Sequence, residues 1–227
     1  MADVFDRPAS RRRLFTVAGA GLALGALAAC GSSSVDEGNG VAKVGQRPGG
    51  YLAGTQIEGG QKLPDLKLTD THGKPFSLAS DITTPVVLLF FGYTNCPDIC
   101  PGILADLASA RQRAGDDVAK QTTVVLVSTD PPRDTPAVMK AYLERIDPGF
   151  IGLTGDLEAI KAAGMTLGIT MEQTSQLPSG GYEITHGTQV YGFGKDRTAQ
   201  VLWSQGTSIG DYKADIANLV TKQETPR

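Results

Sequence analysis

The sequence predicts one α/β domain behind an N-terminal export and tether segment. A hydrophobic content of 41% over 227 residues is enough for a sizeable core. The apolar run Val86–Phe91 has strand length and is typical of a strand buried on both faces, and amphipathic helical segments alternate with further apolar runs. The formal charge of −3, without a Lys/Arg block beyond the N-terminus, argues against nucleic acid as a partner.

Residues 1–29 are predicted to be a lipoprotein signal peptide. The basic residues of SRRR (10–13) precede an uncharged, apolar stretch at 14–29, which is too short and too rich in Gly and Ala for a permanent membrane span. The stretch ends on Leu-Ala-Ala-Cys30, which resembles the lipobox of bacterial lipoproteins, where the cysteine becomes the lipidated first residue. The basic start also resembles a twin-arginine signal, so export by either Tat or Sec is open. An uncleaved anchor helix is the less favoured interpretation.

The segment 30–50 is Gly/Ser-rich and predicts a flexible tether. Removal of residues 1–29, with their four arginines and two aspartates, leaves 17 basic and 22 acidic residues and a formal charge of −5. Because this chain has no polybasic patch to hold it on anionic lipid, the lipid on Cys30 must do the tethering. We therefore expect residues 51–227 to be a domain anchored at the outer face of the cytoplasmic membrane.

The folded region begins with short extended runs from Tyr51, a turn at 71–74 and a return strand at 75–80, which predict an N-terminal β-hairpin. The strand 86–91 follows, then a helix ending near Gly115 and a second buried strand at 122–130. Asp134, Thr135 and Pro136 are typical of a capped helix start. The residues expected on the inward faces of these two helices are Ile103, Leu104, Leu107 and Ala108, and Val138, Met139, Tyr142, Leu143 and Ile146.

The second half predicts a strand at 150–156, a helix at 156–169 and a turn-rich segment at 174–182. Two facing strands at 187–194 and 198–205 are joined by a charged turn, and a helix at 211–223 closes the chain. This order is that of a thioredoxin-like fold with an additional N-terminal β-hairpin. We expect Trp203 in the core and His72 in an exposed turn.

Cys96 and Cys100 lie in FFGYTNCPDICP, between the buried strand at 86–91 and the next helix. A structural disulfide is the simplest interpretation for an exported protein, but a bridge over so small a loop restricts the unfolded chain little. The helix N-terminus favours negative charge, so we expect a lowered thiol pKa and populated thiolates. Because a thiolate is both a nucleophile and a metal ligand, thiol-disulfide exchange and metal binding both stay open.

The spacing of the two cysteines favours metal binding over thiol-disulfide exchange. Three residues separate the cysteines instead of the two of the usual redox motif, and Pro97 and Pro101 are expected to bias both cysteine backbones away from helix. Two thiolates and an imidazole form a soft ligand set that suits Cu(I), and the imidazole also accepts Cu(II). His186 is expected at a loop-to-strand junction, from which its side chain can swing toward the cysteines.

Residues 92–101 (GYTNCPDICP) and 128–136 (STDPPRDTP), followed by a histidine before the C-terminal hairpin, resemble the Sco/SenC family of copper chaperones for cytochrome c oxidase assembly. The resemblance implies that Cys96, Cys100 and His186 are copper ligands for Cu(I) and Cu(II). The family commonly has Asp before this histidine and Ser or Thr after it. Here Thr185 and Gly187 occupy these positions, so copper affinity or Cu(II) preference is expected to differ.

Two other polar features have simple interpretations. A phosphate site at STDPPRDTP is less favoured than a turn and a capped helix, which account for Asp134, Thr135 and Pro136 without a ligand. Asp98, between the cysteines, could orient a ligand or present charge to a partner, or it could be a solvated loop carboxylate.

The leading hypothesis is a copper metallochaperone that passes the ion by ligand exchange to an acceptor such as the copper site of cytochrome c oxidase. Since an oxidised cysteine pair cannot take copper, a thioredoxin-like reductant is expected as a partner. A thiol-disulfide oxidoreductase acting on the cysteines of a copper-accepting subunit is the alternative, and a peroxiredoxin-type peroxidase is less favoured. Whether the chain is an enzyme stays open.

Overall fold

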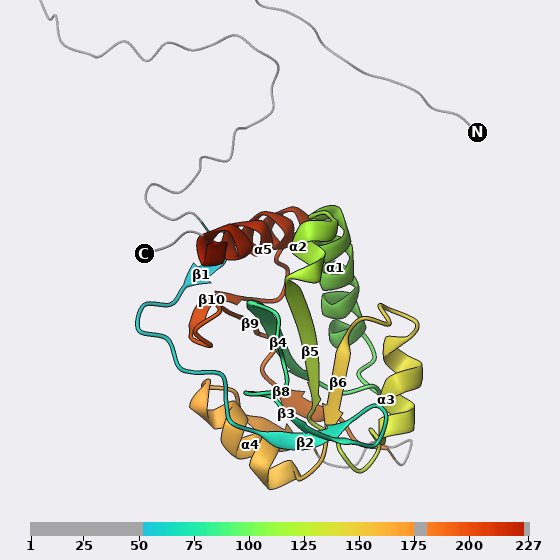
Figure 1. Ribbon diagram of the computed structural model, residues 1–227. Helices are drawn as coiled ribbons and strands as arrows, with labels where there is room; N and C mark the ends of the chain where they lie inside the picture. Colours follow the sequence, from blue (N-terminus) through green and yellow to red (C-terminus); the bar gives the residue numbers. More distant parts are fainter. Residues whose placement is uncertain (1–51, 175–180, 225–227) are drawn as a thin grey trace, which may run out of the picture. The chain divides into compact units, whose positions relative to one another are not determined.

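The protein, seen in a computed structural model that describes residues 52–174 and 181–224, is built on an eight-stranded sheet of order β1-β10-β9-β4-β5-β6-β2-β3 (Figure 1). Its three central strands run parallel and are β4 (Val86–Gly92), β5 (Thr122–Ser128) and β6 (Ile151–Thr154). They confirm the strands predicted at 86–91, 122–130 and 150–156. All seven residues of β4 are buried, as a central parallel strand requires.

The predicted hairpins extend both edges of this sheet. Strands β9 (Val190–Phe193) and β10 (Ala199–Trp203) pair antiparallel next to β4, and β1 (Thr55–Gln56) pairs with β10. On the other side, β2 (Lys67–Asp70) and β3 (Pro75–Ser77) form the predicted N-terminal hairpin and join β6. The expected exposed turn residue between β2 and β3 is His72, whose side chain is 65% exposed.

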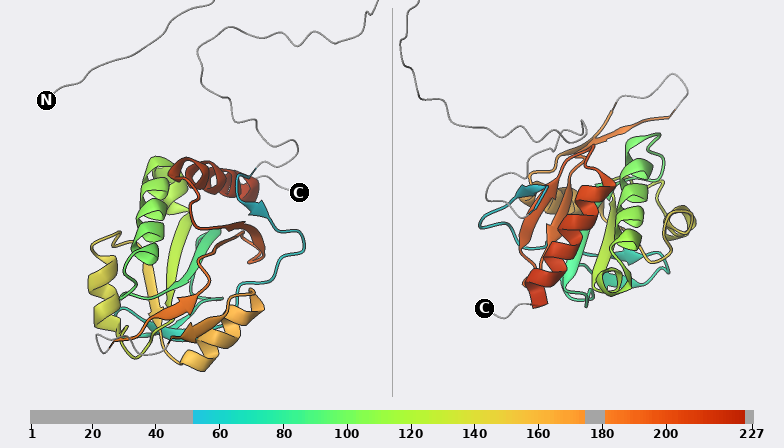
Figure 2. Two further views of the ribbon diagram at one scale, coloured as in Figure 1. Left: turned by 180° about the vertical axis from the view of Figure 1, so that it is seen from behind. Right: turned by 90° about the horizontal axis from the view of Figure 1, so that it is seen from above.

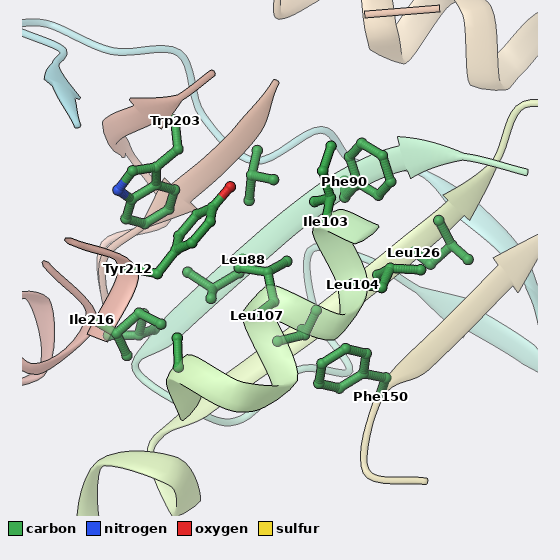
Figure 3. Close-up of a cluster of buried hydrophobic side chains, with 14 of the residues drawn as sticks. Leu88, Phe90, Ile103, Leu104, Leu107, Leu126, Phe150, Trp203, Tyr212 and Ile216 are labelled. Carbon is green, nitrogen blue, oxygen red and sulfur yellow. The ribbon is translucent and has the colours of Figure 1, made fainter. Parts of the chain in front are cut away.

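Residues of β4 alternate between two hydrophobic clusters, one on each face of the sheet. Helices α1 (Ile99–Arg113), α3 (Pro136–Leu143) and α5 (Ile209–Glu224) contribute to one cluster, and α4 (Leu157–Thr166) contributes to the other. Helices α1 and α5 lie side by side over the sheet (Figure 1, Figure 2). Figure 3 shows the first cluster, in which leucines of α1 lie against β4. Trp203, which is fully buried as predicted, lies beside Tyr212 of α5.

Three predicted details differ from the structure. Val138 was expected to face inward but is 41% exposed, because the buried stripe of α3 is Met139, Tyr142 and Leu143 and Val138 lies one residue outside it. Helix α1 ends at Arg113, near Gly115 as predicted, but the short helix α2 (Asp116–Lys120) that follows was not predicted. Helix α5 begins at Ile209, two residues before its predicted start.

The first described residues are fixed to α5 by a buried carboxylate. Asp215 accepts hydrogen bonds from the backbone N–H groups of Ala53 (2.7 Å) and Gly54 (2.8 Å) and from the indole of Trp203 (2.7 Å). Asp215 is 1% exposed, so these donors replace the hydrogen bonds to water that its side-chain oxygens lose on burial. Ala53 and Gly54 are therefore held against α5.

The predicted signal peptide (1–29), Cys30 and the tether (30–50) lie outside the described residues and stay predictions. Within residues 52–174 and 181–224, no helix combines the length and apolar character needed to cross a membrane.

Candidate metal centre

Cys96, Cys100 and His186 lie together at the carboxyl end of β4. Cys96 is in the loop after β4, Cys100 is in the first turn of α1, and His186 is the last residue of β8 (Ile184–His186). One ligand atom from each lies within 4.8 Å of the others, and Cys100 Sγ is 3.4 Å from His186 Nε2. Both cysteines are free. Two sulfurs and one imidazole nitrogen are thus arranged for a soft transition-metal ion.

Helix α1 begins inside the cysteine motif. The backbone N–H of Cys100 donates to Cys96 Sγ at 3.3 Å, so the helix N-terminus points a donor at this sulfur. The expectation that proline keeps both cysteine backbones out of helix is wrong for Cys100, because Pro101 lies in the first turn, where its missing N–H is not needed. Asp98 is exposed at the start of α1 and makes no side-chain cap bond, as expected of a solvated loop carboxylate.

Gly92, the last residue of β4, leaves the space that the Cys100 sulfur occupies. A Cβ atom at this position would lie 3.1 Å from Cys100 Sγ, 2.8 Å from Phe90 and 3.3 Å from Leu126. These separations are shorter than ordinary contacts between such atoms. The glycine of the GYT sequence is therefore needed for the close approach of the sulfur to the strand.

Burial governs the protonation of the inner cysteine. Cys100 is 0% exposed, and this desolvation, followed by a hydrogen bond with Cys96, raises the pKa of its thiol. The lowered pKa expected from the helix N-terminus is wrong for Cys100, because the loss of water outweighs the helix dipole. Without a metal the Cys100 side chain is a neutral thiol, and a cation that binds it must displace its proton.

The imidazole of His186 is held in one orientation. Its Nδ1 lies 2.8 Å from the carbonyl oxygen of Gly187, and since a carbonyl only accepts, Nδ1 carries the proton and Nε2 faces Cys100 with a free lone pair. The ring packs edge-on against Phe90 (6.0 Å) and Tyr93 (5.6 Å between centroids). Burial lowers the pKa of His186, which favours the neutral form that binds metals.

The setting of His186 differs from its predicted junction with the main sheet. Strand β8 pairs with β7 (Met171–Gln173) in a separate two-stranded sheet, and His186 is opposite Met171. These two unpredicted strands flank the segment 174–182 that was expected to be turn-rich, and the small hairpin they form carries the imidazole to the cysteines.

A buried carboxylate connects the cysteine loop to β5, and sequence reasoning assigned it another role. Asp134 is 0% exposed and accepts hydrogen bonds from the hydroxyls of Thr94 and Ser128, both at 2.6 Å, while burial raises its pKa. The residue that caps α3 is Thr135, which accepts from the Val138 N–H at 3.4 Å. The capped-helix interpretation is therefore confirmed for Thr135 and Pro136 and wrong for Asp134. The sequence signal for the actual role of Asp134 was the number of hydroxyl residues around it in STDPPRDTP.

Comparison with known proteins gives a consistent result. The family model SCO1/SenC matches residues 55–221. Mitochondrial protein SCO2 of Saccharomyces cerevisiae is 39% identical over 97 residues, which are 43% of this chain and 32% of that protein. Mitochondrial SCO1 homolog 1 of Arabidopsis thaliana is 34% identical over 128 residues, 52% of this chain and 38% of that protein. These two matches thus cover less than half of each relative's length.

Two solved structures overlap the described domain. The copper-bound ScoI of Bradyrhizobium japonicum is 30% identical, with a TM-score of 0.61 over 70% of this chain and 98% of that one. The apo Sco1 of Thermus thermophilus is 31% identical, with a TM-score of 0.66 over 74% of this chain and 96% of that one. These overlaps confirm the predicted thioredoxin-like α/β fold. Since the family match covers most of the chain, the protein belongs to the SCO1/SenC family.

Proposed function

We propose that this protein is a copper metallochaperone that holds the ion with Cys96, Cys100 and His186 and passes it to a copper protein such as cytochrome c oxidase. The observation that carries the proposal is the convergence of two sulfurs and one imidazole nitrogen within 4.8 Å. A relative with 30% identity has been solved with copper bound, which supports copper as the ion. Three ligands suit transfer, because an acceptor thiolate can bind the ion before the donor ligands leave.

The proposal includes a membrane anchor. Residues 1–29 direct export by Tat or Sec, and lipidated Cys30 and the 30–50 tether hold the domain at the outer face of the cytoplasmic membrane. In an oxidising compartment a thioredoxin-like reductant keeps the cysteine pair ready for copper.

A second candidate is a thiol-disulfide oxidoreductase that acts on the cysteines of the copper acceptor. It is favoured by the partly exposed Cys96, whose sulfur receives the helix N–H of Cys100 at 3.3 Å. In this reaction the Cys96 sulfur attacks the acceptor disulfide, Cys100 then resolves the mixed disulfide, and the acceptor leaves with two thiols while the pair is oxidised. Turnover on a disulfide peptide without copper, together with the reduction potential of the pair, separates the two functions.

Copper titration of the reduced domain tests the proposal. We expect one ion per chain, loss of uptake in Cys96→Ser, and a greater loss of Cu(II) than of Cu(I) affinity in His186→Ala, because Cu(I) retains two thiolates. His72→Ala is the matched control, since this other histidine lies in an exposed turn away from the cysteines. Copper uptake that survives Cys96→Ser, or His186→Ala behaving like His72→Ala for both oxidation states, would contradict the ligand set.

A further inference from the structure

The hairpin that carries His186 is too small to hold itself in place. Strands β7 and β8 have three residues each and form their own two-stranded sheet. Such a short isolated pair is marginally stable in water. Contacts outside the hairpin must therefore keep the imidazole over the cysteines.

Asp130, Arg133 and Tyr182, which we call the Arg133 clasp, supply such contacts. The Arg133 guanidinium lies 3.8 Å from the centroid of the Tyr182 ring, and its Nη1 donates to the Tyr182 carbonyl oxygen at 3.1 Å. The Arg133 Nε donates to Asp130, and the Tyr182 hydroxyl donates to the other oxygen of Asp130 at 2.7 Å. Each clasp residue thus contacts both of the others. Tyr182 lies four residues before His186, so the clasp holds the chain close to the imidazole.

The Asp130 carboxylate of the clasp is shielded from water, whereas Arg133 and Tyr182 are partly exposed. Asp130 is 2% exposed, and the Arg133 side chain is 28% exposed. Charge-assisted hydrogen bonds and a cation–π contact are worth more at a site with little water than on an open surface. The clasp therefore adds stabilising contacts to the short hairpin from outside it.

The clasp starts from the same loop that supports the cysteine motif. The Thr129 N–H donates to the Gly92 carbonyl at 2.8 Å, and Asp134 binds the Thr94 hydroxyl. Tyr93, from the cysteine side, receives the Ile184 N–H at 3.5 Å and packs against the His186 ring. Residues 129–134 thus fix the position of the imidazole relative to the two sulfurs.

We propose that Asp130, Arg133 and Tyr182 are positioning residues that hold His186 over the cysteine pair and thereby set the preference for Cu(II) over Cu(I). The inference rests on the proposed copper-binding function. Cu(I) is satisfied by the two thiolates, whereas Cu(II) also requires the imidazole. If the hairpin is released, Cu(II) affinity falls with the fraction of molecules in which His186 is in place, and Cu(I) affinity changes little.

The test compares Arg133→Leu, Tyr182→Leu and Tyr182→Phe with Arg111→Leu. Arg111 also pairs with an aspartate, Asp147 at 2.8 Å, but it lies about 16 Å along α1 from Cys100. We expect Arg133→Leu and Tyr182→Leu to lower Cu(II) affinity about 10- to 100-fold, the usual effect of removing a partner that orients a metal ligand. Tyr182→Phe keeps the ring over Arg133 and should lose less, and Arg111→Leu should lose nothing.

The ratio of Cu(II) to Cu(I) affinity is the deciding readout, because general destabilisation would lower both. Equal loss of both ions in folded Arg133→Leu, or no loss of Cu(II) affinity in Arg133→Leu and Tyr182→Leu, would overturn the proposal. If Arg133→Leu does not fold, Tyr182→Leu decides the question, since Tyr182 is only partly buried.

A second measurement needs no copper. The Thr174 N–H donates across the hairpin to the Glu183 carbonyl, and the Ile184 N–H donates outside it to the Tyr93 hydroxyl. In the reduced, metal-free domain, hydrogen exchange of both amides should be faster in Tyr182→Leu than in the natural chain. Unchanged exchange would overturn the positioning role even if the wild type bound no copper. Faster exchange in a chain that takes up no copper would refute the proposed function and leave the positioning role supported.

Discussion

Replacing Gly92 with alanine tests whether a glycine at the end of β4 is required for the close approach of the Cys100 sulfur. The added Cβ would lie 2.8 Å from Phe90, 3.1 Å from Cys100 Sγ and 3.3 Å from Leu126. All three neighbours are 0% exposed and packed in the same cluster, so none can move freely. Overpacking of this kind typically costs about 1–3 kcal/mol.

The matched control is the same substitution in the first part of α1. A Cβ at Gly102 has no neighbour within 4 Å, and Gly102 lies within the helix. Alanine is favoured over glycine in a helix interior by up to about 1 kcal/mol, so Gly102→Ala should stabilise the domain. One chemical change, ten residues apart, is thus expected to have opposite signs.

Urea unfolding of the reduced, metal-free domain measures both effects. Thermal unfolding gives the same comparison, because for a domain of this size each kcal/mol shifts the melting temperature by roughly 2–4 °C. We also expect Gly92→Ala to weaken copper binding, because the added Cβ displaces Cys100 Sγ from its position 3.4 Å from His186 Nε2. A Gly92→Ala domain within about 0.5 kcal/mol of the natural one, the range of neutral surface substitutions, would refute the reasoning.

Three further predictions follow from buried groups. Because burial raises the pKa of the Cys100 thiol, copper uptake should release the thiol proton, and copper affinity should rise with pH. Calorimetry in buffers of different ionisation enthalpy should find about one released proton fewer for Cys100→Ser than for the natural chain. Equal proton release would contradict this prediction. Asp134→Ala should lower the free energy of unfolding by about 1–3 kcal/mol, because two buried hydroxyls lose their acceptor, whereas Asp134→Asn should lose less in the same urea titration. Asp215→Ala should free the first described residues, so that limited proteolysis near Ala53 becomes faster. The fluorescence of Trp203 should change, because its indole N–H loses the Asp215 acceptor. Unchanged cleavage would show that other contacts fix the segment.

The strands of the main sheet, most helices and the identity of the candidate ligands could be predicted from the sequence, whereas the β7-β8 hairpin could not. Val86–Phe91 is apolar without interruption, and such a run is explained by burial on both faces of a parallel sheet. Only two histidines and, beyond Cys30, two cysteines occur, so the candidate set was small before any geometry was known. The turn at His72 and the buried Trp203 likewise followed from local residue types.

The protonation of Cys100 and the support of His186 could not be predicted in this way. The helix N-terminus is visible in the sequence and predicts a lowered thiol pKa, but the complete burial of Cys100 depends on residues from several elements and reverses the sign. Asp134 fits a helix cap by sequence, yet its carboxylate turns inward to Thr94, which is 40 residues earlier.

The sequence by itself determined which residues are available for soft-metal chemistry and which segments form the sheet, because residue type and periodicity are local properties. Only the tertiary structure decided which of them meet, how deeply they are buried and what holds them. His186 reaches Cys100 across 86 residues of chain, and Arg133 reaches Tyr182 across 49. Contacts at such separations depend on strand order and packing, which no short stretch of sequence encodes.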